Sequence, residues 1–404
     1  MLSPIDIPQW ISYDLSPVCW VCMAVAFLAS LWLSGVFVSR IRMIINAKED
    51  DDAAAADPSS DAGLAYPPVS VIITSLPGTE PLIPLVEAVL GQEYPAPFEV
   101  IVVIDGVDHG AHDQLHQLML THSNLYTTFA PEDSRNLSRR KLSLMLGIKA
   151  AEYDMLMLTR GNCRILSPLW LRLMMRNAAK GSEVVVGWSV PLQTDVREAG
   201  RLRRAYDTLW TALTWLPRAV KGHPFMGTGC NLAYSRRLFF EQKGFSKSLH
   251  IKSGDDDMFL YEIAAKADCA VELSSESMVE EEVANARLAH RNAKFEHFFT
   301  AKWLPVAPSL MMGSFSLSWW VWLLSAAAAC TLGLPSFLPT IIMALLGIFL
   351  VIYSALKWKA LSRMLGIIPT VWSMPFLALW HPFYQLGYRL KSYARRKSNY
   401  TWNK

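Results

Sequence analysis

The chain has 404 residues and room for two or three domains; 52% of its residues are hydrophobic, 18% are charged, and the formal net charge at pH 7 is only +3. This small charge gives no reason to expect nucleic acid as a partner. The six cysteines do not indicate a disulfide framework, because most of the chain is expected in the cytoplasm, on the topology argued next.

The first apolar segment covers residues 17–38 and contains no charged side chain. It is long enough to cross the roughly 30 Å hydrocarbon layer of a bilayer. It lacks the basic start and the small-residue cleavage site of a signal peptide, so it predicts a membrane anchor behind an extracytoplasmic stub, residues 1–16. The basic residues Arg40, Arg42 and Lys48 follow the anchor, and the positive-inside rule therefore places the next region in the cytoplasm.

The region 39–68 combines this basic flank with an acidic stretch, 46–68, which is rich in small residues and ends in two prolines. Such a composition predicts a flexible linker. From residue 69 onward, β-branched and apolar runs at 69–76, 98–105 and 153–159 alternate with helical patterns. This alternation predicts an α/β fold with a mostly parallel, Rossmann-like sheet and a ligand site beyond the carboxyl ends of its strands.

Two more apolar segments, 313–334 and 336–356, predict two further membrane helices within 304–357. The next apolar stretch, 364–386, contains three prolines and His381, and a crossing there would place the basic C-terminal tail outside. We therefore expect an interfacial or re-entrant segment and a basic tail over 358–404, with a fourth crossing as the alternative. The short loops favour a bacterial inner-membrane protein.

Three consecutive acids, Asp255, Asp256 and Asp257, open an amphipathic helical pattern. One acid is enough to cap a helix start. Three adjacent carboxylates repel one another, which raises the pKa of at least one of them toward the range of a general base. The pattern therefore favours a catalytic role over capping alone.

At this point the chain resembles glycosyltransferase family 2, in the branch that includes ceramide glucosyltransferases and bacterial membrane-bound relatives. Five stretches carry the resemblance, in order: PPVSVIIT, FEVIVVID, SRRKLSLMLGIKAA, GTGCNLAYSRRLFF and GDDDMFL. The resemblance implies a type-A glycosyltransferase fold over 69–303, between an N-terminal anchor and C-terminal membrane helices. It also implies transfer of a hexose from a nucleotide sugar to a membrane-associated lipid or glycan.

The resemblance assigns roles to residues on the donor side. Asp105 matches the acid that contacts the nucleotide base, and Lys141, with Arg139 and Arg140, matches the basic helix start that faces the donor. Asp257 matches the base that deprotonates the acceptor hydroxyl, with Asp256 beside it.

On the acceptor side, Gly227, Gly229 and Asn231 match a turn that contacts the acceptor. The stretch 201–225 is rich in arginine and carries Trp210 and Trp215. It fits an ordinary half-buried helix, or a helix at the level of the lipid headgroups that guides a lipid-linked acceptor.

Two motifs depart from the family. Its LTDADC appears here as LTRGNC, so Arg160 and Asn162 stand where metal-handling aspartates belong. Its Gln-x-x-Arg-Trp motif falls at Ala293, Glu296 and His297. The usual ligands of Mg²⁺ or Mn²⁺ are therefore missing, although a guanidinium can itself bind phosphate through two hydrogen bonds.

These departures leave two hypotheses. The first is a metal-independent transferase in which Arg160 replaces the cation. The second is an inactive pseudo-glycosyltransferase, since Glu296 adds a negative charge where the family has a positive one. Such a protein would bind a lipid intermediate, or would scaffold another glycosyltransferase or envelope-assembly subunit.

Overall fold

The computed structural model describes residues 14–75, 82–105, 109–131, 138–191, 198–283 and 285–394. The chain forms two compact units. The helical unit contains Met1–Met43, Leu202–Thr214 and Ala307–Gly387, and the α/β unit contains Ile44–Arg201, Trp215–Val306 and Tyr388–Lys404.

The α/β unit is built on a mostly parallel sheet, as predicted. In the described part of the chain, seven strands lie in the order β3-β2-β1-β4-β8-β6-β9. The strands are β1 (Val69–Ser75), β2 (Phe98–Asp105), β3 (Leu125–Ala130), β4 (Met155–Arg160), β6 (Val184–Gly187), β8 (Leu232–Ser235) and β9 (Cys269–Glu272). Strand β8 runs antiparallel to both of its neighbours, and the other pairs are parallel. β2 and β4 therefore both direct their carboxyl ends, Asp105 and Arg160, to one edge of the sheet.

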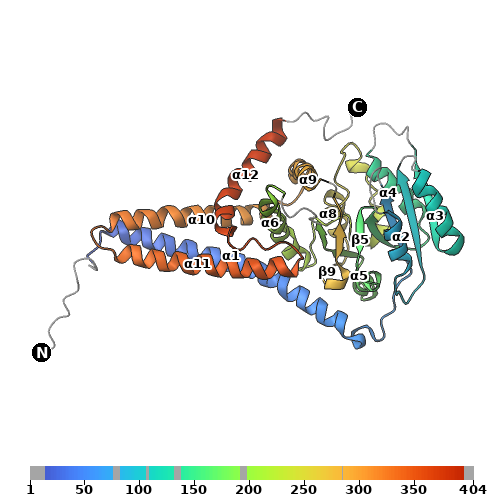
Figure 1. The fold of residues 1–404 in the computed structure, drawn as a ribbon, viewed down its shortest axis with the longest axis horizontal. Coiled ribbons are helices and arrows are strands. Elements are labelled where there is room, and N and C mark those ends of the chain that lie inside the picture. Colours follow the sequence, from blue (N-terminus) through green and yellow to red (C-terminus); the bar gives the residue numbers. More distant parts are fainter. Residues whose placement is uncertain are drawn as a thin grey trace. The chain divides into compact units, whose positions relative to one another are not determined.

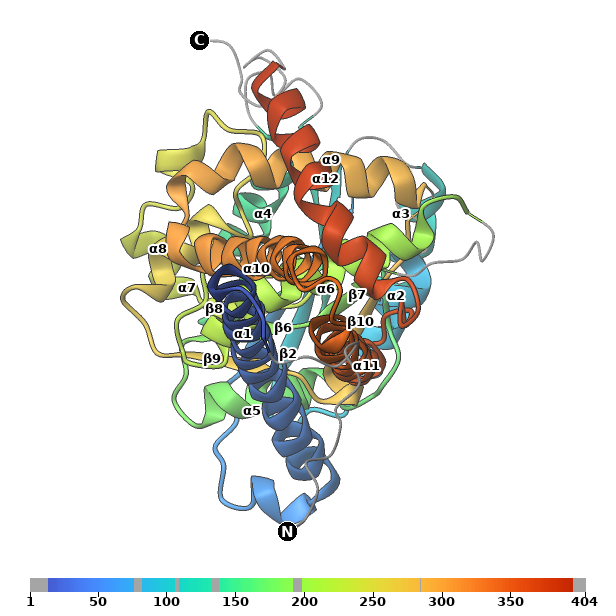
Figure 2. The ribbon, with the colours of Figure 1, turned by 90° about the vertical axis from the view of Figure 1, so that its left-hand side faces the viewer.

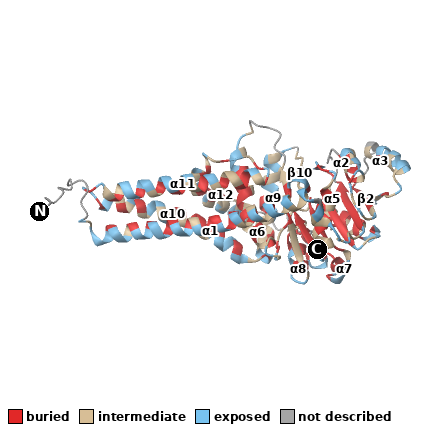
Figure 3. Cartoon of the chain, turned by 90° about the horizontal axis from the view of Figure 1, so that it is seen from below, coloured by how far each residue is buried: buried red, intermediate tan, exposed pale blue. Residues whose placement is uncertain are grey.

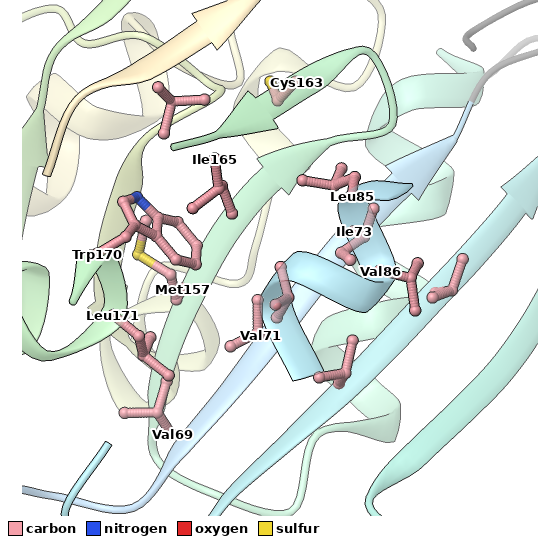
Figure 4. Packing of buried hydrophobic residues seen from close by; sticks show 14 of the residues in the cluster. Val69, Val71, Ile73, Leu85, Val86, Met157, Cys163, Ile165, Trp170 and Leu171 are labelled. Atoms are coloured by element: carbon pink, nitrogen blue, oxygen red, sulfur yellow. The ribbon is translucent and has the colours of Figure 1, made fainter. Parts of the chain in front are cut away.

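Helices cover both faces of this sheet. They are α2 (Leu82–Leu90), α3 (His109–Thr121), α4 (Arg139–Ala150) and α5 (Trp170–Ala179). On one face, Val71 and Ile73 of β1 pack with α2 and α5 in a fully apolar core (Figure 4). On the other face, α4 approaches so closely at Gly147 that a Cβ there would lie 2.5 Å from Cγ2 of Ile72. This close approach fixes the start of α4 beside the strand ends.

A smaller sheet adjoins the end of β4. Its strands lie in the order β5-β10-β7, and they are β5 (Cys163–Ile165), β7 (Ser189–Pro191) and β10 (Val279–Glu281). The β5–β10 register sets Glu281 opposite Cys163. Three helices complete the part of the unit that carries the site, namely α7 (Arg236–Glu241), α8 (Met258–Ala264) and α9 (Ala286–Thr300).

The helical unit contains most of the apolar segments predicted from sequence. Its elements belong to α1 (Pro17–Ala56), α6 (Arg201–Ala219), α10 (Val306–Leu332), α11 (Leu338–Met364) and α12 (Met374–Ala394). Among the described residues, three helices are long and apolar enough to cross a membrane, and these are α1, α10 and α11. They run side by side (Figures 1 and 2), and their outward faces are exposed although they are apolar (Figure 3). An exposed apolar belt of this kind is typical of lipid-facing helices.

The predicted flexible linker is partly wrong. Helix α1 continues to Ala56, and a short 3-10 helix follows at Pro58–Asp61. The reason is local, because alanine and lysine favour helix and Lys48 pairs with Asp52 one turn later, at 3.0 Å. Residues 1–13 of the predicted stub and 395–404 of the predicted basic tail lie outside the described residues.

Candidate functional site

The side chain of Asp256 lies between two arginines at the carboxyl end of the parallel strands. Its Oδ2 accepts a hydrogen bond from Nη2 of Arg140, at 3.0 Å, and from Nη2 of Arg160, at 2.9 Å. Arg140 comes from the first turn of α4 and Arg160 ends β4. The Asp256 side chain is 27% exposed, so a ligand can reach this carboxylate.

Each arginine also has a second acidic partner. Nε of Arg140 lies 2.7 Å from Oδ2 of Asp255, and Nη1 of Arg160 lies 3.6 Å from Oε1 of Glu281. Asp255 thus holds the guanidinium group of Arg140 independently of Asp256, and Glu281 adds a longer ion pair to Arg160. Charge-assisted bonds of this kind fix direction as well as position.

Gly229 lets the two guanidinium groups approach the backbone closely. A Cβ on Gly229 would lie 2.4 Å from Nη2 of Arg160 and 2.5 Å from Nη2 of Arg140. The nearby Gly227 donates its backbone N–H to the carbonyl of Asp256, at 2.9 Å. The turn predicted to contact the acceptor thus packs against the arginine pair and the acidic segment.

Asp257 does not face the same space as Asp256. It is 7% exposed, caps α8 by accepting the N–H of Met258, and accepts the hydroxyl of Thr300. Burial, followed by the charge of Asp256, raises the pKa of Asp257 to about 7. Asp255 is equally enclosed, and burial followed by the charge of Asp256 raises its pKa to about 7 as well. Asp256 is thus the acid of the three that is open to a substrate.

Lys141, which was predicted to face the donor, lies in the interior of the α/β unit. Its side chain is fully buried, and Nζ donates to the carbonyl of Ser248 at 2.7 Å, to the Ser248 hydroxyl at 3.0 Å and to the carbonyl of Ile251 at 3.0 Å. Burial lowers the pKa of Lys141 to about 8. All three protons of the ammonium are used, so Lys141 positions the segment that precedes the acids. Asp105 is likewise engaged, because Arg139 contacts both of its carboxylate oxygens.

The remaining residues predicted on the acceptor side are buried. Asn231 is fully enclosed, and its side chain joins Nε1 of Trp170 to the carbonyls of Trp188 and Ser277. Trp215 packs against Trp188 inside the α/β unit.

Trp210 lies in the helical unit and is also buried. It packs against Tyr206, Phe315 and His381, whose ring centroid is 4.5 Å away. The Trp210 and Trp215 rings are thus core residues, which supports the half-buried helix over the headgroup-level alternative.

Asn162 and Glu296 border the arginine pair. Nδ2 of Asn162 donates to the carbonyl of Glu282 at 2.9 Å, which fixes this amide to the end of β10. Glu296 lies on α9, near enough for the charges of Asp256 and Asp255 to act on it. Partial desolvation of the carboxyl, followed by those two charges, raises the pKa of Glu296 to about 7. Because Glu296 is exposed to solvent, water screens part of this electrostatic shift in its pKa.

Two contributors were not predicted from sequence. Glu281 belongs to the run VEEEV, a sequence pattern that is typical of a solvent-exposed acidic segment. In the structure, β10 places the carboxylate of Glu281 beside Arg160. Thr300 donates a hydrogen bond to Asp257, which lies 43 positions earlier in the sequence, and no local sequence pattern predicts this contact.

The residues present do not fit a divalent cation. Mg²⁺ and Mn²⁺ need several oxygen ligands converging on one point. Here a guanidinium occupies the end of β4, and the exposed carboxylate of Asp256 already binds two arginines. Within the described ranges, no group of three or more His, Cys, Asp or Glu residues is arranged to hold a metal ion.

No protein-family profile and no curated protein matches the sequence. Among solved structures, the chain is similar to the mannosyltransferase PcManGT from Pyrobaculum calidifontis, in complex with GDP-Man and Mn²⁺. The alignment covers 85% of this chain and 96% of that chain, with 16% sequence identity and a TM-score of 0.49. A similarity at this level carries no substrate or mechanism over to this chain.

Proposed function

We propose that the α/β unit is a family-2-type glycosyltransferase that binds the diphosphate of a nucleotide sugar with Arg140 and Arg160 in place of a divalent cation. One observation carries the proposal. Two guanidinium groups converge on a single carboxylate oxygen, at 3.0 and 2.9 Å, at the carboxyl end of a parallel strand. Open α/β sheets bind their ligands at that edge, and paired guanidinium groups suit a diphosphate in charge and geometry.

The reaction needs the charge of the leaving group to be stabilised. As the bond between the sugar C1 and the diphosphate breaks, negative charge develops on the leaving oxygen, and Arg140 and Arg160 offset it. The acceptor hydroxyl oxygen forms the new bond to C1 while its proton passes to Asp256, the exposed acid of the trio. The products are the glycosylated acceptor, with inverted configuration at C1, and a nucleoside diphosphate held by the two arginines.

The helical unit supplies the membrane part of the proposal. Helices α1, α10 and α11 would anchor the protein in a bacterial inner membrane, with the α/β unit on the cytoplasmic side where nucleotide sugars are made. The acceptor would be a membrane-associated lipid or glycan. Labelling of introduced cysteines in inverted membrane vesicles, from the cytoplasmic or from the periplasmic side, tests this topology. Labelling of Arg164→Cys from the periplasmic side would contradict it.

Isothermal titration calorimetry on the full-length protein in detergent tests the donor site. The titrants are a panel of nucleotide sugars, each measured with Mn²⁺ and with a chelator. We expect metal-independent binding that is lost in Arg160→Gln and kept in Arg164→Gln, an exposed arginine on β5, the strand that follows β4 in the sequence. Binding that requires Mn²⁺, or no binding to any donor, would overturn the proposal.

A second candidate is a pseudo-glycosyltransferase that holds a lipid intermediate or a partner enzyme. Among the described residues, four carboxylates lie around the two guanidinium groups, namely Asp255, Asp256, Glu281 and Glu296. When all are ionised, this charge opposes an anionic donor. Absence of donor binding in the calorimetry would favour the second candidate.

A further inference from the structure

Asp256 already occupies the position that a phosphate oxygen would take. A single oxygen, Oδ2, accepts from Nη2 of both arginines, and both Nη2 atoms lie over the bare Cα of Gly229. The backbone of Asp256 is fixed, because its carbonyl accepts the N–H of Gly227 at 2.9 Å. The side chain of Asp256 is partly exposed, so its displacement needs no movement of this backbone.

We propose that Asp256 is an internal ligand of the arginine pair, that the diphosphate of the donor displaces it, and that the displaced carboxylate then serves as the base toward the acceptor. This inference rests on the proposed function and adds a coupling between its two substrates.

The second acidic partners make the exchange feasible. Arg140 keeps its bond to Asp255 and Arg160 keeps Glu281 when Asp256 leaves, so both guanidinium groups stay in place. The two freed Nη2 groups then face the same point. A diphosphate carries more charge than one carboxylate and offers several oxygens, so it competes well for both groups.

Displacement changes the chemistry of Asp256. While its Oδ2 accepts hydrogen bonds from Nη2 of both arginines, this oxygen is occupied and cannot accept the proton of an acceptor hydroxyl. Once the diphosphate takes these two hydrogen bonds, the carboxylate of Asp256 is available to the acceptor. The base is therefore active only when a donor is bound, so the donor binds before the acceptor reacts.

Competition between Asp256 and diphosphate can be measured with inorganic pyrophosphate, UDP and GDP as titrants of the full-length protein in detergent. The variant Asp256→Asn removes the competing charge and keeps the shape. Asp256→Ala serves as a second variant, and Asp113→Asn, an exposed acid on α3, is the matched control. Thermal unfolding of each variant checks that it is folded.

We expect both Asp256 variants to bind pyrophosphate or a nucleoside diphosphate at least tenfold more tightly than the wild type, and to transfer no sugar. Asp113→Asn should match the wild type in both respects. Wild-type binding with equal or weaker binding by the Asp256 variants would overturn the exchange and leave the proposed function intact. Tighter binding with full transfer would remove Asp256 as the base. No binding by any form would remove the proposed function itself.

Discussion

The carboxyl of Glu296 should make donor binding depend on pH. The pKa of Glu296 is raised to about 7, first by partial desolvation of the carboxyl and second by the charges of Asp256 and Asp255. A bound diphosphate adds negative charge and raises this pKa further, so binding takes up a proton. The sign follows from linkage: affinity increases as the pH falls from above the ligand-bound pKa toward the ligand-free pKa near 7.

The size of the effect can be bounded. One fully coupled carboxyl with a ligand-free pKa of about 7 tightens binding by up to ~10-fold between pH 8 and pH 6. Because Glu296 is exposed, solvent screening reduces this to about threefold. Glu296→Gln removes the charge, so affinity at pH 8 should rise by about threefold and the pH dependence should become smaller. The dependence that remains would belong to Asp255 and Asp257, whose pKa values are also raised to about 7, and to Lys141, whose pKa is lowered to about 8.

Calorimetry with an intact nucleotide sugar measures this directly, since both of its phosphates are esterified and do not titrate between pH 6 and pH 8. Glu241→Gln is the control, because Glu241 is a surface glutamate that pairs with Arg237 at 2.7 Å. If Glu296→Gln keeps the wild-type affinity at pH 8 and the wild-type ratio between pH 6 and pH 8, the electrostatic reasoning fails.

Three further substitutions have separate outcomes. Gly229→Ala forces the two guanidinium groups apart and should weaken nucleotide-sugar binding, measured by calorimetry, at least tenfold. Gly91→Ala is the control, because a Cβ there makes only ordinary contacts, and it should leave the affinity unchanged. Asp207→Ala removes the buried carboxylate 2.8 Å from Nε2 of His381 and should lower the unfolding free energy of the helical unit by about 3 kcal/mol, measured in detergent with a denaturant. Asn231→Ala removes three buried hydrogen bonds and should cost about 3 kcal/mol by the same measurement, and a loss of acceptor affinity without destabilisation would support its predicted role.

The first half of the α/β unit could be predicted from sequence because its signals are local. Strands β1, β2 and β4 are runs of apolar residues separated by helical patterns, and such runs specify buried parallel strands without outside help. The second half could not be predicted in the same way. Strands β6 and β8 have only four residues each, and β8 enters the sheet antiparallel between β4 and β6. Such pairing is determined by tertiary contacts that leave no periodicity.

The candidate site shows the same division. The sequence identified Asp256, Arg140, Arg160 and Gly229, and the structure brings these four together. The sequence could not reveal that Lys141 is buried, because the carbonyl oxygens that accept its hydrogen bonds belong to residues more than a hundred positions away. Adjacent residues of one motif can therefore have unrelated roles.

The start of helix α4 illustrates this in its three consecutive basic residues. Arg139 pairs with Asp105, Arg140 binds Asp255 and Asp256, and Lys141 enters a slot lined by backbone carbonyls. Successive side chains on a helix diverge by about 100°, so the three cannot share partners. Transposing Arg140 and Lys141 would leave composition, net charge and helical propensity untouched. It would nevertheless place a planar fork where a compact ammonium fits, and a single-point donor where two-pronged binding is needed. In this turn the order of the basic residues, and not their composition, determines which partner each side chain binds.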